Sequence, residues 1–145
     1  MKTIVLSGVV GAILGVVLTA AAFAEAGGGH GTYTLWAIAS LPGLAFGIGR
    51  TYAMFSMLTG PILQWTVLGL CVGMVVSGRR ALWAFGILGV GVAYIVAWLA
   101  GGDLRESLDS ETADKAMLAG LITGVVFIVI SIIMLIAARR RARTK

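Results

Sequence analysis

The sequence predicts an all-α integral membrane protein: a compact bundle of four transmembrane helices and one broken, re-entrant or interfacial segment. Of the 145 residues, 59% are hydrophobic and only 12% are charged, whereas soluble domains carry about 25% charged residues. Residues 116–138 contain no charge and no proline, and as a helix they are long enough to cross the ~30 Å hydrocarbon core of a bilayer. A basic tail at residues 139–145 follows at once. The length suits a single domain over residues 1–145.

The first predicted span is residues 4–24, an uninterrupted apolar run that begins after Lys2. Small residues recur at every fourth position, which lets another helix approach closely; these are Ser7, Gly11, Gly15 and Thr19. The alternative is a cleaved signal peptide, because a small-x-small pattern at residues 22–24 precedes Glu25. We favour a retained span, because the run is longer than the ~7–15 residues of a signal core.

Residues 34–58 are apolar enough to enter the membrane but are interrupted by Pro42 and carry Arg50. Proline removes a backbone donor and opposes the helix before it. An arginine at the centre of a span costs roughly 2.5–3.5 kcal/mol on insertion scales. We expect two short helices, one of them re-entrant or interfacial; a single kinked span is the alternative. The glycine-rich residues 25–33, with His30 among them, are expected to form a loop.

The next two spans are predicted at residues 61–77 and 81–100, separated by Arg79 and Arg80. Pro61 fits the first turn of a helix, where its missing N–H costs little. The earlier span has a ridge of small or packing residues at Trp65, Gly69, Gly73 and Ser77, and the later span has one at Gly89, Ala93 and Ala97. Three aromatic residues suit interfacial depths: Trp83, Tyr94 and Trp98.

Residues 101–115 form the only strongly polar connection and are expected to be a solvated, acidic outer loop. A short helix can start near its end, with Ser110 or Thr112 as its cap. The last span, 116–138, has its ridge at Ala116, Gly120 and Gly124. Such ridges predict tight helix packing, either within the chain or between copies.

Lysine and arginine accumulate on the cytoplasmic side of membrane proteins. The tail at 139–145 therefore places the C-terminus in the cytoplasm, the acidic loop outside and Arg79 inside. The favoured solution has four spans with both termini inside; the alternative has five, with the N-terminus outside and His30 inside. We expect a bacterial inner (plasma) membrane location.

Four residues are candidate ligand-binding groups. Arg50 at membrane depth is the first, because ionisable residues there usually mark a site. The alternative is that Arg50 lies on an interfacial helix and extends its side chain to the lipid headgroups. Tyr52 and Gln64 are polar groups that could line the same place. His30 could bind a metal or carry a proton, although a hydrogen-bonding role in its loop is the simpler interpretation.

We expect that this protein is not an enzyme and binds no cofactor. No Ser/His/Asp set is placed for hydrolysis, and a single histidine excludes bis-histidine haem within one chain. The lone cysteine, Cys71, reads as a packing residue, and Met54, Met57 and Met74 read as packing groups rather than as copper ligands. The basic charge beside a span also argues against nucleic acid.

The favoured function is a non-enzymatic subunit, assembly factor or scaffold of a membrane complex. Its expected partners are the lipid bilayer and either a second copy or another membrane protein. The first alternative is a conduit or binding site for an anion, lipid headgroup or small solute, built on 34–58 with Arg50. The second is a metal or redox role of His30 that a partner completes.

Overall fold

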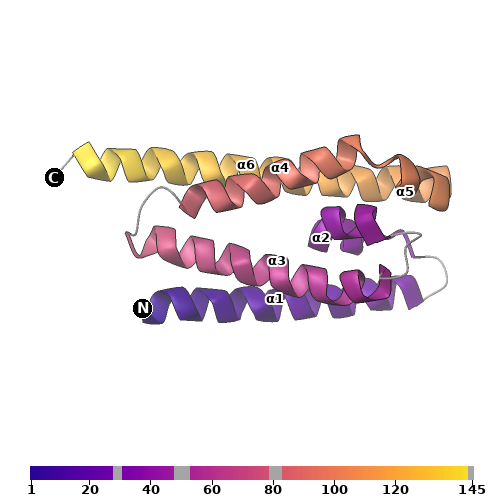
Figure 1. Cartoon of the computed structure of the whole chain (residues 1–145), viewed down its shortest axis with the longest axis horizontal. Coiled ribbons are helices and arrows are strands. Elements are labelled where there is room, and N and C mark those ends of the chain that lie inside the picture. The colour runs from indigo at the N-terminus through magenta and orange to yellow at the C-terminus, as the bar shows by residue number, and fades with distance from the viewer. Residues whose placement is uncertain (28–30, 48–52, 79–82, 144–145) are drawn as a thin grey trace.

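The computed structural model describes residues 1–27, 31–47, 53–78 and 83–143. Every regular element within these ranges is a helix, in agreement with the predicted all-α class. Figure 1 shows two antiparallel pairs of long helices, α1 (Lys2–Gly27) with α3 (Ala53–Val76), and α4 (Ala84–Leu99) with α6 (Ser110–Arg143). The ends of α1 and α6 that carry the chain termini lie at the same end of the bundle.

The short helix α2 (Thr34–Gly47) is wedged between the two pairs at the opposite end of the bundle. It contacts α1, α3, α4 and α6 and thereby holds the pairs together. The segment predicted as broken, 34–58, is thus divided between α2 and the start of α3. Because α2 extends along only part of the bundle, it separates the two pairs at one end and not at the other (Figure 1).

The helices α1 and α3 touch backbone to backbone. A methyl group added at Gly11 would lie 2.1 Å from the carbonyl oxygen of Trp65, and one added at Gly69 would lie 2.2 Å from that of Ser7. Any larger residue at either glycine would push the helices apart, so the absence of a side chain is what permits the contact. The ridges predicted on these two spans therefore pack against each other within the chain, except at Ser77, which is exposed and lies beyond the end of α3.

The pair α4–α6 is built in the same way around Gly91 and Gly124, where a methyl group on Gly91 would lie 2.9 Å from the Gly124 carbonyl oxygen. The predicted ridge of α6, at residues 116, 120 and 124, is buried. The ridge predicted for α4 is wrong at two of its three positions, because Gly89 and Ala93 are exposed. The buried face of α4 is rotated from it and consists of Ala84, Ile87, Gly91, Tyr94 and Ala97.

Two further expectations are corrected. Pro61 lies inside α3 rather than in its first turn, because the helix already begins at Ala53. Proline is tolerated within packed membrane helices, and Pro61 is fully buried where Gly15 of α1 faces its carbonyl oxygen.

The region expected to be a solvated loop, 101–115, is largely helical. It contains α5 (Gly102–Ser107) and the first turns of α6. Asp109 caps α6, since its carboxylate accepts a 2.9 Å hydrogen bond from the backbone N–H of Thr112. Neither Ser110 nor Thr112 is the cap. A short polar helix can form here because it packs on α6 through Leu104, which is buried.

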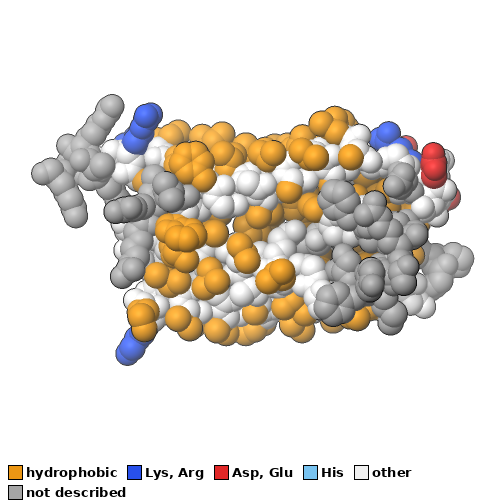
Figure 2. Space-filling model, in the orientation of Figure 1, with side chains coloured by type: hydrophobic (Ala, Val, Ile, Leu, Met, Phe, Trp, Pro, Cys, Tyr) orange, Lys and Arg blue, Asp and Glu red, His pale blue; other side chains and the backbone are white. Residues whose placement is uncertain are grey.

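Within the described ranges, three helices are long and apolar enough to span a membrane: α1 over 26 residues, Met57–Val76 of α3 over 20 residues, and Ser110–Arg140 of α6 over 31 residues. The helices α2 and α4 are apolar but shorter. Figure 2 shows hydrophobic side chains along the visible flank, with charged side chains gathered at the two ends. These features indicate a membrane protein.

Candidate functional site: a broken helix and an apolar groove

The helix α2 is broken at Ser40, whose backbone (φ −168°, ψ 73°) is extended rather than helical. Pro42, two residues later, has no N–H to donate to the carbonyl of Ile38. The N–H of Gly43, which would reach the carbonyl of Ala39 in a regular helix, donates instead to the Ser40 hydroxyl at 3.3 Å. The break therefore releases two carbonyl groups inside the bundle.

Side chains from two other helices bind both released carbonyls. The Tyr94 hydroxyl on α4 donates to Ile38 at 2.7 Å. On α3, Gln64 Nε2 and Trp65 Nε1 donate to Ala39 at 2.9 and 3.1 Å. The other Gln64 N–H reaches the Tyr94 oxygen at 2.8 Å. In a lipid-surrounded interior each unsatisfied backbone group costs several kcal/mol, so this cluster is what makes the break tolerable.

This cluster revises two sequence-based interpretations. Tyr94, expected at interfacial depth, has no exposed surface and lies in the core. Gln64, a candidate ligand-binding residue, donates both of its side-chain N–H groups, to the Ala39 carbonyl and to the Tyr94 hydroxyl. Its structural role is therefore established, whereas its role in ligand binding stays a prediction.

The other three candidates, His30, Arg50 and Tyr52, lie outside the described residues. In the chain, residue 30 precedes α2, and residues 50 and 52 come between α2 and α3. Among the described residues, no group of three or more His, Cys, Asp or Glu side chains comes together. The metal or redox role of His30 remains a prediction that needs ligands from elsewhere.

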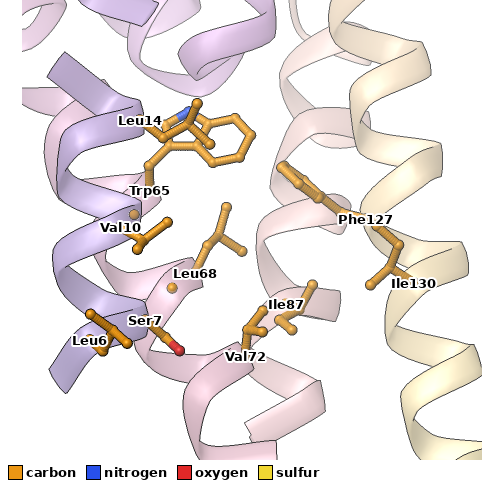
Figure 3. A pocket seen from close by; sticks show the side chains of 12 residues that line it. Leu6, Ser7, Val10, Leu14, Trp65, Leu68, Val72, Ile87, Phe127 and Ile130 are labelled. Atoms are coloured by element: carbon orange, nitrogen blue, oxygen red, sulfur yellow. The ribbon is translucent and has the colours of Figure 1, made fainter. Parts of the chain in front are cut away.

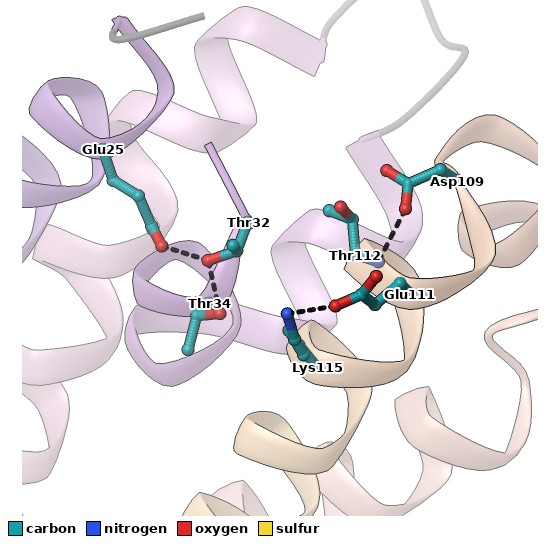
Figure 4. A network of polar contacts seen from close by, with 7 residues as sticks. All are labelled: Glu25, Thr32, Thr34, Asp109, Glu111, Thr112 and Lys115. Carbon is teal, nitrogen blue, oxygen red and sulfur yellow. Dashed lines mark hydrogen bonds and ion pairs between the residues drawn. The ribbon is translucent and has the colours of Figure 1, made fainter. Parts of the chain in front are cut away.

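A side chain near the C-terminal end of α1 binds the N-terminus of α2. Glu25 accepts a hydrogen bond from the Thr32 hydroxyl through one carboxylate oxygen (Figure 4). Its other carboxylate oxygen accepts a 2.9 Å bond from the backbone N–H of Leu35. Tyr33, immediately before α2, has a left-handed backbone with φ of 53°. Glu25 thus acts as a helix cap supplied from another helix, and both of its oxygens are engaged.

An apolar groove of about 410 Å³ lies between the two helix pairs. Its rim is formed by exposed side chains of α1 and α6, which barely touch each other: Leu6, Val10, Leu14 and Ile130. Its floor is formed by the buried side chains of Leu68, Ile87 and Phe127. Figure 3 shows these groups facing the space from both pairs.

Aromatic rings line one end of the groove. Trp65 and Phe127 meet edge to face with ring centroids 5.5 Å apart, and Tyr94 packs on Phe127 at 5.8 Å. Trp65 belongs to both features, because its ring lines the groove while its N–H binds Ala39 at the α2 break. The groove therefore stops where the wedge of α2 begins.

Sequence reasoning did not find the groove. Leu6, Val10 and Leu14 repeat at helical spacing, but α1 is apolar on every face, so periodicity cannot separate a groove-facing stripe from a lipid-facing one. Its volume lies within the ~300–1,000 Å³ of ligand pockets. Its lining by described residues offers shape and apolar contact, and among these residues Ser7 is the one polar side chain besides the Trp65 ring.

No protein-family model, no curated protein and no solved structure matches this chain. The function is accordingly argued from the geometry above.

Proposed function

We propose that this protein is a non-enzymatic membrane subunit, assembly factor or scaffold. The observation that carries the proposal is the use of the interior polar side chains: Gln64, Trp65 and Tyr94 bind the backbone at the α2 break. Groups engaged in this way rigidify a fold and are not available to line a polar conduit. The same bundle leaves long apolar faces of α1 and α6 exposed, which suits contact with lipid and other membrane helices.

The proposed topology has four crossings, with α2 re-entrant and both termini in the cytoplasm of a bacterial inner membrane. It is supported by the placement of the charges. Lys2, Arg139 and Arg140 are exposed at the end of the bundle where α1 begins and α6 ends (Figure 1). The other end carries Glu25, Asp109 and the acidic side chains around α5, together with the two cations Arg105 and Lys115. This segregation follows the positive-inside rule.

Cysteine accessibility tests the topology. In a Cys71→Ala background, we expect His30→Cys and Glu106→Cys to react with a membrane-impermeant maleimide on intact cells, and Lys145→Cys to react only after permeabilisation. Labelling of residue 106 from the cytoplasmic side would overturn the proposed orientation. Protection of residue 30 with labelling of residue 106 would favour five crossings instead.

The scaffold role is tested by its partners. Mild solubilisation followed by cross-linking and native mass spectrometry should find a stable assembly containing either a second copy or another membrane protein. A chain that stays strictly monomeric and alone at its natural abundance would remove this proposal.

A second candidate is a binding site or conduit for an anion, a lipid headgroup or a small solute, built on the broken segment 34–58 with Arg50 as its charge. Two observations favour it. Broken, short membrane helices are typical of binding sites, and α2 is one. Trp36 on the same helix has a buried Nε1–H with no acceptor among the described residues.

Arg50→Ala should then abolish phosphate or chloride efflux from proteoliposomes while the bundle keeps its thermal midpoint, and Arg105→Ala should serve as the unaffected control. Efflux that is equal in the wild type, in Arg50→Ala and in protein-free vesicles would rule out a conduit for these two anions.

A further inference from the structure

We propose that the apolar groove between α1 and α6 holds one acyl chain of an anionic phospholipid whose headgroup lies against the basic end of the bundle. The proposal requires only that the bundle is embedded in lipid, and it holds for any partner that the scaffold serves. Its first support is position. The groove is open on the flank between two membrane-length helices, where the surrounding molecules are lipids.

The dimensions favour a lipid chain over a helix. Along α1 the groove runs from Leu6 to Leu14, which is about 12 Å of helix axis. A transmembrane helix is ~10–12 Å wide and ~30 Å long, and α2 already fills the space between the pairs at the other end of the bundle. A single flexible chain fits a short groove of about 410 Å³ that ends at the Trp65 and Phe127 rings.

The basic side chains near the groove favour a lipid with an anionic headgroup. An acyl chain gains little by leaving other acyl chains for an apolar groove, so any preference must come from the headgroup. Lys2 lies one helical turn before Leu6 on α1, and Arg139 and Arg140 end the apolar run of α6 on the other side of the groove. All three are exposed at the end of the bundle that carries the chain termini, which is nearer to Leu6 than to Leu14 along α1. This arrangement complements a negative headgroup.

The test uses Trp65 as a reporter, because its ring lines the groove. Replacing Trp36, Trp83 and Trp98 by phenylalanine leaves Trp65 as the only indole among the four tryptophans of the full chain. The protein is placed in phosphatidylcholine vesicles that contain either phosphatidylglycerol or phosphatidylcholine with dibrominated acyl chains, at equal mole fraction. We expect brominated phosphatidylglycerol to quench Trp65 more strongly, with a relative binding constant, obtained from the quenching curves, that is about fivefold higher for each cation engaged.

Matched variants separate the groove from the general lipid annulus. Val10→Phe fills the groove and should remove the preference, whereas Val9→Phe, at a residue that is also exposed on α1 but outside the groove, should retain it. The combined substitution of Lys2, Arg139 and Arg140 by glutamine should equalise the two lipids, and Arg105→Gln at the opposite end should not. Each variant is first checked for the wild-type thermal midpoint.

Equal quenching by both lipids in the otherwise unmodified reporter protein would overturn the proposal, as would a preference that survives in Val10→Phe. Shielding of Trp65 from both lipids, together with a disulfide between copies carrying Leu6→Cys, would show that a second copy covers the groove instead. A failed partner search would leave this test unchanged, so the two proposals fail separately.

Discussion

The hydroxyl of Tyr94 on α4 donates a 2.7 Å hydrogen bond to the carbonyl oxygen of Ile38 on α2. Pro42 leaves that carbonyl without its helical donor. Tyr94 thus joins α4 to the break in α2. Gln64 on α3 donates a 2.8 Å hydrogen bond to the same hydroxyl. At the break, hydrogen bonds therefore connect α2 with both helix pairs, through Gln64 of α3 and Tyr94 of α4.

Tyr94→Phe removes the donor to Ile38 and the acceptor for Gln64, so we expect the free energy of unfolding to fall by about 1–3 kcal/mol, the cost of stranding a buried polar group. Denaturation in mixed detergent micelles, followed by circular dichroism, measures the change. Thr66→Val is the control, because the Thr66 hydroxyl only bonds the Ile62 carbonyl of its own helix. If the two variants lose the same stability, the proposed role of the cluster is wrong.

Gly11→Ala should destabilise the bundle by about 1–3 kcal/mol, the usual cost of overpacking. The new methyl group would lie 2.1 Å from the Trp65 carbonyl oxygen, which is backbone and cannot rotate away. At Gly89 nothing lies within 4 Å of an added methyl group. Gly89→Ala should therefore be neutral or slightly stabilising, since alanine is the better helix former by about 1 kcal/mol. The same detergent titration compares the two, and an equal loss in both would contradict the packing described here.

Glu25→Ala should loosen the start of α2 while leaving the rest of the bundle folded. The Leu35 amide loses its 2.9 Å acceptor, and loss of a cap typically costs ~1 kcal/mol, or about a fivefold gain in local opening. Hydrogen exchange of the peptide that contains Leu35 measures this. Glu106→Ala, at an exposed glutamate on α5, is the control and should leave that peptide unchanged.

The first turn of α6 should depend on pH through Asp109. Hydrogen bonds from Thr112 hold the pKa of the Asp109 carboxyl below its ordinary value. A lowered pKa in the folded state means that the carboxylate stabilises the turn at neutral pH, and that this contribution is lost as the pH falls through the lowered value. The Thr112 amide should then lose protection against hydrogen exchange at acidic pH.

Asp109→Ala should show this low protection at every pH, whereas Asp114→Ala should keep the pH dependence of the wild type. A Thr112 amide whose protection is the same in the wild type and in Asp109→Ala at neutral pH would argue against the cap.

Several features of the candidate site could be predicted from sequence, and others could not. Pro42 predicts the break by itself, because a missing N–H acts locally. Gln64 is conspicuous in the sequence because it is polar within an apolar span, but its partners, Ala39 and Tyr94, are 25 and 30 residues away in the chain. The aromatic side chain of Tyr94 predicts a position at the membrane interface, and nothing local shows that a released carbonyl faces it.

The class of this protein follows from its sequence alone, because the length of an apolar run and the charges at its ends are local properties that lipid and water act on directly. The sequence also indicates where small residues permit close contact, as at Gly11 and Gly69. Which face of each helix is buried depends on the packing of the whole bundle, in which Gly91 rather than Gly89 meets α6. In helices that are apolar on every side, burial follows from the shape of the neighbouring helix, and the groove is the space that those shapes leave unfilled.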